Sequence, residues 1–467
     1  MRHSKAMGVF VALFAAFGLA ACGGGSYSSG GTGGGSDSAS VFTIGTDAPL
    51  AAVVTCPVTI MGITLNNGTT NVPVLQSGNT PTVDFARLSG LHQLVDLQSV
   101  PTGTYYSATV TLASATIGYI DTTQTPPTVT TIPATLTTMS DTVTFPTPYV
   151  VQNADLIGLR MEFDLAKSIA VDGNGQITGS MTPTFNMQLL NSTNAEVSID
   201  DFHATVVSVD SATQFTVQGP KARDWTVQIA PTTVMDDPSV PESSFTTNTI
   251  VSLTGTLDPV SHYIDANEVQ VVSNDKDYLG GLFTYINPAT GPATTADVFV
   301  REELGNAGDI EDGTIADLTL NGSEVYRIGN IALPITTLLF NNSLLRPGQN
   351  IDIAGKITTT NGVSSVTVHR VVLRRQGQEG TLAAGTVVIS SGNVGSFGLN
   401  DNSPAGILLP SPLTVMTTNQ TNFIGVSGLS GLTGTVPLRV VGYVLVNSAA
   451  GTTVLVATSV EELTPNS

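Results

Sequence analysis

The sequence predicts an all-β protein, and three observations lead to that prediction. Thr, Ser, Gly, Val and Asn dominate the 467 residues, whereas charged residues make up only 11%. Val and Thr favour strands, while Gly and Asn favour the turns between them. Short runs of alternating β-branched residues recur between Gly, Asn, Asp and Pro, as in sandwiches and barrels, and helical periodicity is nearly absent.

The chain opens with a charged segment and then an apolar run. Arg2 and Lys5 precede an uncharged stretch at residues 6–21, which is the layout of a secretory signal. The run is short for a membrane-spanning helix, which needs about 20 apolar residues. It ends in the letters LAAC, which closely resemble the lipobox of bacterial lipoproteins. The resemblance implies cleavage after a signal peptide at residues 1–21 and lipidation of Cys22, which would anchor the protein to a membrane.

A Gly- and Ser-rich tether follows the cysteine, at residues 22–40. Such a segment buries too little apolar surface to fold, and we expect a coil of roughly 20–25 Å end to end. Gly23 follows the cysteine, and by resemblance to proteobacterial lipoproteins this favours the outer membrane, on its surface or periplasmic face. The alternative is an ordinary signal peptide in which Cys22 lies at this place by chance.

The first β-rich block spans residues 41–200. Its motifs TDAP, PTGTY, ATVTL and EFDLAKSIAVDGNGQITGSMTP occur in the order found in an uncharacterised domain family common in bacterial lipoproteins. The block resembles that family over residues 41–199. The resemblance implies a β-sandwich of the prealbumin or immunoglobulin-like kind and no particular activity. We expect the last hairpin to start at residues 163–169 and to turn through residues 172–175.

The rest of the chain repeats with a period of about 75–100 residues, so each unit is long enough for its own core. Each unit ends with a strand, a glycine, a hairpin and a strand, and the glycine is expected to bend the barrel. The units resemble small OB-like β-barrels that occur in tandem in secreted bacterial proteins of unknown function. We place the three barrels at residues 201–275, 276–376 and 377–467, with bend glycines Gly255, Gly355 and Gly442 and early-strand phenylalanines Phe215, Phe283 and Phe397.

Net charge and cysteine content argue against two kinds of partner and against a disulfide within the chain. The formal net charge of −20 argues against nucleic acid, which needs a basic face, and against direct adsorption to anionic lipid. With Cys22 lipidated, Cys56 has no partner for a disulfide within the chain. Cys56 lies in an apolar stretch, so we expect a buried thiol that behaves as a small hydrophobic side chain.

Two segments deserve comparison with cation sites. Asp172 begins a stretch like a calcium loop, but Ile177 and Pro183 stand where that loop needs Gly and Glu, so a tight turn is the better explanation. Residues 301–317 hold six acids, Glu302, Glu303, Asp309, Glu311, Asp312 and Asp317, which could gather a cation. We expect a solvated loop there, and no metal or cofactor is predicted.

The sequence contains no motif of a known catalytic site. The four histidines of the mature chain are far apart, and no nucleophile elbow, zinc-protease motif or phosphate-binding loop occurs. Carboxylate pairs such as Asp200-Asp201 and Asp236-Asp237 lie at unit boundaries and in turns. We therefore predict no catalytic residue and no enzyme, although a glycosidase dyad from distant strands stays open. The residues concerned are His92, His203, His262, His369, Asp200, Asp201, Asp236 and Asp237.

Aromatic and basic residues give two further expectations. Trp225 alternates with Val227 and Ile229 and should face a core, which leaves Tyr105, Tyr106 and Tyr119 as a possible sugar platform. The one basic cluster comprises Arg370, Arg374 and Arg375. We expect it to form an exposed strand edge, with ion pairing to an acidic neighbouring domain as the alternative.

These observations lead to an expected function and two alternatives. We expect a lipid-anchored bacterial envelope protein with a structural or binding role at the cell surface and an unknown polymer or protein partner. A carbohydrate or polymer binder is the first alternative, and it should expose Tyr or Trp along one sheet face. An envelope hydrolase is the second, and it should bring two or three buried acids into one cleft. A scaffold should cover its outward faces with Thr and Asn.

Overall fold

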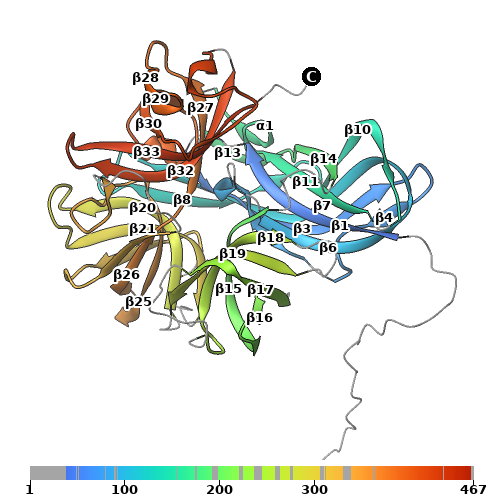
Figure 1. Ribbon diagram of the computed structural model, residues 1–467, viewed down its shortest axis with the longest axis horizontal. Helices are drawn as coiled ribbons and strands as arrows, with labels where there is room; N and C mark the ends of the chain where they lie inside the picture. The colour runs from blue at the N-terminus through green and yellow to red at the C-terminus, as the bar shows by residue number, and fades with distance from the viewer. Residues whose placement is uncertain are drawn as a thin grey trace, which may run out of the picture. The chain divides into compact units, whose positions relative to one another are not determined.

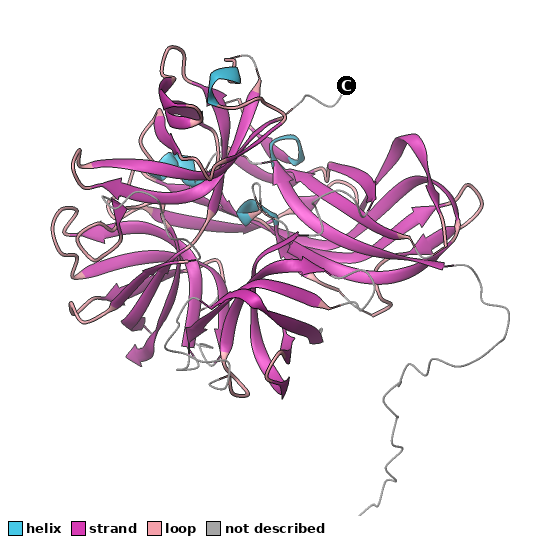
Figure 2. Ribbon diagram, viewed as in Figure 1, coloured by secondary structure: helices cyan, strands magenta, loops and turns pink. Residues whose placement is uncertain are grey.

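Strands account for nearly all of the regular structure, and the predicted all-β fold class is confirmed. Figure 2 shows the few helical turns among the strands of a computed structural model. Among the residues that the structure describes, no helix is long and apolar enough to cross a membrane. The predicted signal peptide and Cys22 lie outside the described residues, which are 38–463 without 49, 51, 79, 89–90, 92, 154, 174–175, 192–197, 220–223, 236–244, 258–262, 274–276, 306–309, 311, 330–337, 361–362 and 435.

The first module is a sandwich of two main sheets. The smaller sheet has the order β14-β11-β1-β6, with β1 parallel to β11 and antiparallel to β6. The larger sheet has β10, β7, β3 and β4 along its length, with β2, β5 and β8 at its margins. The bounds are β1 (Ser38–Ala48), β2 (Val53–Thr55), β3 (Pro57–Asn66), β4 (Asn71–Pro73), β5 (Thr82–Asp84), β6 (Gln93–Pro101), β7 (Gly103–Asp121), β8 (Thr128–Pro133), β10 (Ser140–Val151), β11 (Leu156–Asp164) and β14 (Phe185–Asn191).

Alternation of side chains explains the sandwich core. Along β7 buried and partly exposed residues alternate, so that Val110 and Leu112 face inward. Leu159 and Met161 on β11 do the same from the facing sheet, and all four belong to one core cluster. A small third sheet completes the module, from β9 (Thr135–Leu136), β12 (Ile169–Val171) and β13 (Ile177–Met181).

The second module is a closed barrel with strand order β15-β16-β17-β19-β18. Its first, second, third, fifth and fourth strands follow one another around the barrel, and β17 runs parallel to β19. This order is that of an OB-like barrel. The bounds are β15 (Ser198–Ser211), β16 (Gln214–Gln218), β17 (Asp224–Met235), β18 (Ile250–Leu257) and β19 (Ile264–Ser273).

The third and fourth modules repeat this order. In one, β22 pairs in parallel with β26 and closes β20, β21, β22, β26 and β25 into a ring. In the other, β30 pairs in parallel with β33 and closes β27, β29, β30, β33 and β32. The bounds are β20 (Asp277–Asn287), β21 (Thr295–Gly305), β22 (Ile315–Thr319), β25 (Asn350–Thr360), β26 (Val363–Leu373), β27 (Gln376–Leu382), β29 (Val394–Asp401), β30 (Leu413–Thr417), β32 (Pro437–Asn447) and β33 (Thr452–Glu462).

Short additional strands extend these two barrels. β23 (Val325–Ile328) lies along β26, β28 (Val388–Ser391) along β29, and β31 (Asn422–Ile424) along β33. β24 (Leu338–Leu339) precedes β25 in the chain but pairs with β32 of the last barrel. The third module therefore contributes a strand to the sheet of the fourth.

The three predicted bend glycines occupy equivalent bulges. The strand register shifts at Gly255, Gly355 and Gly442, each time in the fourth strand of its barrel. A Cβ atom at Gly255 would lie 2.3 Å from the carbonyl oxygen of Asp265, and one at Gly442 would lie 2.1 Å from that of Val456. Only glycine allows the two strands to approach this closely. The prediction of a bend at these positions is confirmed.

One local prediction was wrong, whereas the three early-strand phenylalanines do lie near the start of their barrels. Residues 165–168 form a short helix, α1 (Leu165–Ser168), because the Asp164 carboxylate accepts a hydrogen bond from the Lys167 backbone amide and starts a helical turn. Phe283 lies on the first strand of its barrel, whereas Phe215 and Phe397 lie on the second strands of theirs. All three phenylalanines are buried, so the shared pattern reflects burial rather than equivalent position.

Hydrophobic cores cross the borders between modules. One cluster joins Val54 of the sandwich to Phe299 of the third module and Phe397 of the fourth. A second joins Phe283 to Tyr443, and a third places Phe42 of β1 with the core of the first barrel. Asp37–Ser467 accordingly forms one compact unit, whose strands are labelled in Figure 1.

Candidate functional site

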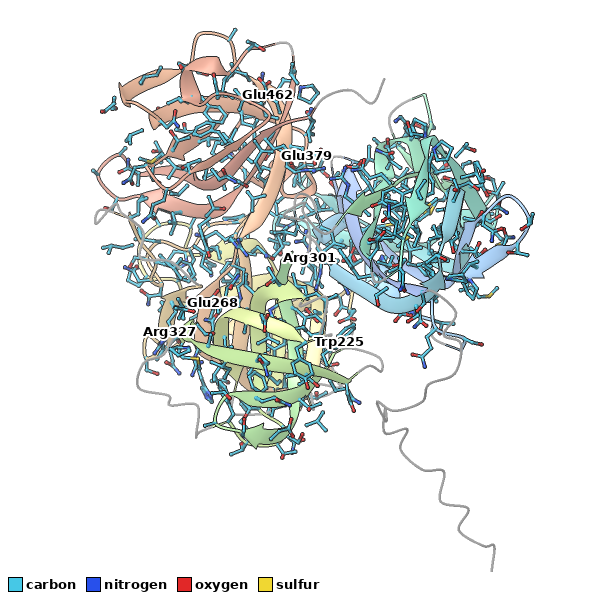
Figure 3. All side chains as sticks on the ribbon, turned by 45° about the vertical axis from the view of Figure 1, so that its right-hand side comes forward. Trp225, Glu268, Arg301, Arg327, Glu379 and Glu462 are labelled. Atoms are coloured by element: carbon cyan, nitrogen blue, oxygen red, sulfur yellow. The ribbon has the colours of Figure 1, made fainter. Side chains whose placement is uncertain are left out.

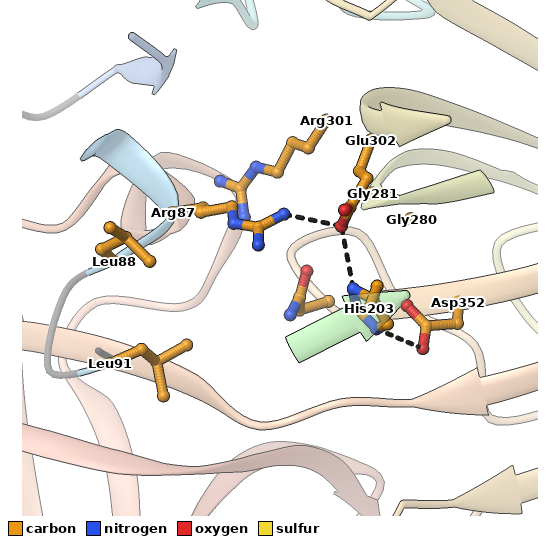
Figure 4. Close-up of a pocket in the computed structure, with 10 residues that line it drawn as sticks. Arg87, Leu88, Leu91, His203, Gly280, Gly281, Arg301, Glu302 and Asp352 are labelled. Atoms are coloured by element: carbon orange, nitrogen blue, oxygen red, sulfur yellow. Dashed lines mark hydrogen bonds and ion pairs between the residues drawn. The ribbon is translucent and has the colours of Figure 1, made fainter. Parts of the chain in front are cut away.

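Four strands from two barrels bring four polar side chains together. His203 comes from β15, Tyr278 from β20, Glu302 from β21 and Asp352 from β25. All four are buried, with at most 7% of any of them exposed. Figure 4 shows His203 between Glu302 and Asp352, and we call these four residues with their arginine partners the ionic cluster.

His203 contacts a carboxylate through each ring nitrogen. Nδ1 lies 2.8 Å from Oε2 of Glu302, and Nε2 lies 3.2 Å from Oδ2 of Asp352. The imidazolium form donates from both nitrogens, so the arrangement suits a charged ring. The Tyr278 hydroxyl donates to Oδ1 of Asp352 at 2.6 Å. Gly280 leaves room for this contact, because a Cβ there would lie 2.7 Å from the Tyr278 hydroxyl oxygen.

Two arginines complete the ionic cluster. Nη1 of Arg87, in the sandwich, donates to Oε2 of Glu302 at 2.7 Å. Arg374 follows β26 and donates through Nε to Asp352 and through Nη1 to the side-chain oxygen of Gln270 in the first barrel. The ionic cluster thus joins side chains from the sandwich, the first barrel and the second barrel.

Local structure positions Arg87 for this contact. Asp84 ends β5 and caps the short helix η1 (Phe85–Arg87), because its carboxylate accepts from the Ala86 amide at 3.2 Å. The same carboxylate accepts from the Thr55 hydroxyl and from the Cys56 amide, both at 2.7 Å. Cys56 itself is buried and forms no disulfide, so the prediction of a buried thiol is confirmed.

Electrostatics keep both acids ionised. Burial would raise the pKa of Glu302, but Arg87 and His203 outweigh it and lower the pKa to about 2. Burial opposes ionisation of Asp352 in the same way, and Arg374 and His203 lower its pKa to about 2. Burial, followed by the charge of Asp352, raises the pKa of Tyr278 well above its usual value. Glu302 and Asp352 therefore stay ionised over the physiological pH range.

These properties limit the chemistry of the cluster. A catalytic acid works best with a pKa near the working pH, whereas Glu302 and Asp352 are far below it. A histidine base needs a ring nitrogen directed at the nucleophile or substrate, whereas both nitrogens of His203 face carboxylates. The arrangement is suited to holding modules together through buried, paired charges.

A larger cavity adjoins the cluster on the side of the sandwich. Its volume is about 210 Å³, and its charged and amide lining consists of Asp84, Arg87, Gln93, Arg301, Glu302 and Asp312. Threonine hydroxyls complete the polar wall, and we call this space the threonine-lined cavity. A smaller cavity of about 30 Å³ reaches His203.

Arg301 lines both cavities from β21. Its Nε donates to the backbone oxygen of Val54 at 3.1 Å. Burial lowers the pKa of Arg301 to about 10, against the opposing influence of Asp84. The guanidinium is therefore a poorly hydrated cation at the cavity wall.

A second buried ionic contact joins the last barrel to the sandwich. Arg439 on β32 lies 2.6 Å from Glu379, 3.5 Å from Glu461 and 3.0 Å from Glu162 of β11. Burial alone would lower the pKa of Arg439, but the three carboxylates, led by Glu379, raise it. Arginine–carboxylate ion pairs therefore occur at two junctions between modules.

Two sequence predictions about charged residues were wrong. Glu302 does not belong to a solvated loop, because β21 continues through it and buries its side chain. Arg374 does not lie on an exposed strand edge, because it is 4% exposed and pairs with Asp352. Arg370 donates through Nη1 to the backbone oxygen of Val271 at 2.6 Å. Both arginines thus contact the neighbouring first barrel, through Gln270 and the Val271 backbone, whereas the ion pair of Arg374 lies within its own barrel.

The remaining sequence predictions have mixed outcomes. Trp225 is buried, as predicted, and Figure 3 shows its place in the first barrel. Tyr105 is also buried and its hydroxyl donates to the Pro101 oxygen, so it offers no sugar platform, while Tyr106 is exposed. Asp172 accepts from the Gln176 amide, as expected of a tight turn. The side chains of Asp200 and Asp201 and the whole of His92, His262, Asp236, Asp237, Asp309 and Glu311 lie outside the described residues.

Among the described residues, no group of three or more His, Cys, Asp and Glu side chains could hold a metal ion. The sequence analysis did not identify Arg87, Tyr278, Arg301 or Asp352. Their contacts join residues between 22 and 247 positions apart, so no local motif marks them. The available signal was a charge inside an otherwise apolar strand, as at Asp352 between Ile351 and Ile353.

Comparison with known proteins gives one family match. A family model described as "Domain of unknown function (DUF4382)" matches residues 40–178, within the sandwich. This agrees with the predicted resemblance to an uncharacterised domain family. Curated proteins give no significant match. A solved structure titled "drosophila Unr CSD456" is 7% identical, with a TM-score of 0.14, over 56% of this chain and 97% of that chain. That score is too low to support any inference.

Proposed function

We propose that this chain is a lipid-anchored bacterial envelope protein with a structural or binding role and no catalytic activity. The LAAC box at Cys22 and the Gly- and Ser-rich tether after it support the anchor. Two or more acyl chains hold a protein stably on a bilayer, at about 0.8 kcal/mol per buried CH₂. The tether would keep the folded modules close to the outer membrane, with an envelope polymer or protein as partner.

One observation supports the structural role most strongly. The single carboxylate of Glu302 contacts Arg87 from the sandwich and His203 from the first barrel, while its own strand belongs to the second. Removing one partner from such a cluster leaves a buried charge uncompensated. The cluster thus makes the relative placement of three modules mutually dependent, as a rigid scaffold requires.

The outward faces of the sandwich agree with a scaffold. Cross-strand pairs of small polar side chains cover them, such as Thr109 with Thr142 at 2.8 Å and Asn66 with Asn71 at 2.7 Å. Such pairs stabilise a sheet and keep its surface hydrated. The hydrolase alternative expects buried acids that converge, and Glu302 and Asp352 do converge. Their lowered pKa values nevertheless favour an ionic contact over acid catalysis.

The threonine-lined cavity favours a second candidate function, the binding of a carbohydrate or other polar polymer. Its lining of hydroxyl, amide, carboxylate and guanidinium groups offers both donors and acceptors. This candidate is compatible with the lipid anchor, since a surface protein needs to recognise material outside the cell.

Cell fractionation with a Cys22→Ala variant tests the proposed anchor. We expect the wild-type protein in the membrane fraction and the variant in the soluble fraction, because the variant has no thiol to acylate. Protease treatment of intact cells then separates the two faces of the outer membrane, since only a surface protein is digested. A variant that fractionates like the wild type would show that Cys22 is not lipidated.

A further inference from the structure

We propose that the threonine-lined cavity binds a small ligand with one carboxylate and several hydroxyl groups, the chemistry of a uronic acid residue. The inference rests on the proposed binding role and specifies its ligand. Three properties of the cavity support it: its volume, the donors of Arg301, and the mixed polar groups around them.

The volume selects a small ligand. At about 210 Å³ the cavity has room for several water molecules, each of which occupies about 30 Å³ in the liquid. The adjoining cavity of about 30 Å³ next to His203 is too small for an organic ligand. The ionic cluster therefore forms one end of the site, and the ligand lies between the sandwich and β21.

Arg301 favours a ligand that carries a carboxylate. In the described part of the chain its hydrogen bonding runs through Nε, to Val54, which leaves the donors of Nη1 and Nη2 for a ligand. The neighbouring Arg87 guanidinium is engaged by Glu302 (Figure 4). A guanidinium binds a carboxylate through two parallel hydrogen bonds, and burial strengthens that pair. An anionic ligand would also offset the burial that lowers the pKa of Arg301.

The other residues that line the cavity favour a ligand with hydroxyl groups. Gln93 supplies an amide, Thr116 a hydroxyl, and Asp312 a carboxylate that accepts hydrogen bonds. Asp84 is held in place by Thr55 and Cys56, so its oxygens are preorganised acceptors. None of the described lining residues is aromatic, so the ligand is bound by polar contacts rather than by stacking.

Calorimetric titration of the full chain, purified in detergent, tests the ligand class. D-glucuronate should bind saturably at one site. D-glucose, which has the hydroxyls alone, and acetate, which has the carboxylate alone, should each bind at least roughly 10-fold more weakly. Glucose that binds as tightly as glucuronate would refute the role of the carboxylate. Absence of saturable glucuronate binding at about 10 mM would refute the proposal, since weaker affinities are negligible for a specific site.

Titration with a uronate trimer distinguishes a polysaccharide ligand from a free sugar acid. If the trimer binds at least as tightly as the monomer, the ligand is a residue within an envelope polysaccharide. If the trimer is excluded while the monomer binds, the ligand is a free sugar acid. Both results support the ligand class.

A variant of Arg301 and a matched control test whether glucuronate binds in the threonine-lined cavity. Arg301→Gln should weaken glucuronate binding by roughly 10- to 100-fold. Arg327→Gln is the matched control, because Arg327 lies on β23 and does not line the cavity (Figure 3). A folded Arg301→Gln variant with unchanged affinity would refute the proposal.

A second variant is needed in case Arg301→Gln does not fold, because Arg301 also donates a hydrogen bond to the backbone of Val54. Thr116→Val keeps the shape of the side chain and removes the hydroxyl, so it should weaken binding by roughly 3- to 10-fold. Wild-type affinity in Thr116→Val would refute the role of the hydroxyl wall. Fractionation of Cys22→Ala is independent of these titrations, so failure of ligand binding and failure of the anchor are distinguishable.

Discussion

A buried carboxylate stays ionised when cationic side chains contact it. Glu302 meets that condition with Arg87 and His203. Asp352 meets it with His203 and Arg374. Since each of the two acids contacts a side chain of another module, a single side chain here affects the contact between whole modules. The effect of one substitution should therefore be large and should depend on pH.

Glu302→Gln should destabilise the protein by about 3–5 kcal/mol at pH 7, because it removes the buried carboxylate that Arg87 and His203 share. Denaturant unfolding measures the change. Lys167→Ala is the control, since the exposed Lys167–Asp164 pair should contribute at most about 1 kcal/mol. A Glu302→Gln variant as stable as this control would contradict the assignment of Glu302 to a buried ionic contact.

Acid should weaken the same cluster. The folded-state pKa values of Glu302 and Asp352 are about 2, below their usual 4.5 and 3.8. The stability that they contribute is therefore present above pH 4.5 and is lost as the pH falls toward 2. Urea unfolding between pH 7 and pH 2 measures the loss, which should be smaller in Glu302→Gln. Equal acid sensitivity in wild type and variant would contradict the lowered pKa.

Asp401 should show the opposite pH dependence. Burial raises its pKa to about 6, and its Oδ2 is buried without a hydrogen-bond partner. The stability of the protonated form is present below pH 3.8 and is lost as the pH rises through 6. Asp401→Asn should therefore stabilise the protein by roughly 1–2 kcal/mol at pH 7.5 and by less at pH 4. A difference that is the same at both pH values would contradict this expectation.

At the scale of the element, the glycine bulges define the barrels. Gly255, Gly355 and Gly442 each occupy the register shift of the fourth strand, where backbone of the neighbouring strand fills the space of a side chain. The three glycines could be recognised as a repeat in the sequence because the backbone geometry of these bulges accepts only glycine. The short helix α1 was missed because one cap, Asp164, overrides the strand pattern around it.

Gly442→Ala should destabilise the last barrel by about 2 kcal/mol or more, because its Cβ would lie 2.1 Å from the Val456 oxygen. Gly434→Ala is the matched control in the same barrel, since a Cβ there meets nothing within 4 Å. Thermal unfolding followed by circular dichroism compares the two. Equal melting temperatures would show that the bulge does not require glycine.

At the scale of the molecule, the strand-rich architecture could be predicted from the sequence, whereas the candidate site could not. Alternation and turn residues act over a few positions, so they predict strands and the succession of sandwich and barrels. The Arg87–Glu302 contact joins residues 215 positions apart, and only the pairing of modules brings them together. Arg374 was expected at an exposed edge for the same reason, because its partner Gln270 belongs to another barrel.

Shared cores and buried ionic contacts make one structural unit of the sandwich and the three barrels. Val54, Phe299 and Phe397 lie in one cluster, and Arg439 joins β32 to Glu162 of the sandwich. Modules that share a core cannot unfold without exposing apolar surface on their neighbours. This unity is the central property that a rigid envelope scaffold needs.

Differential scanning calorimetry of the full chain tests that property most directly. One cooperative transition, with the calorimetric enthalpy equal to the van't Hoff enthalpy, is the predicted result. Glu302→Gln should lower the melting temperature of that transition or divide it into separate transitions. Separate transitions for the sandwich and the barrels in the wild-type protein would contradict the conclusion that the modules form one unit.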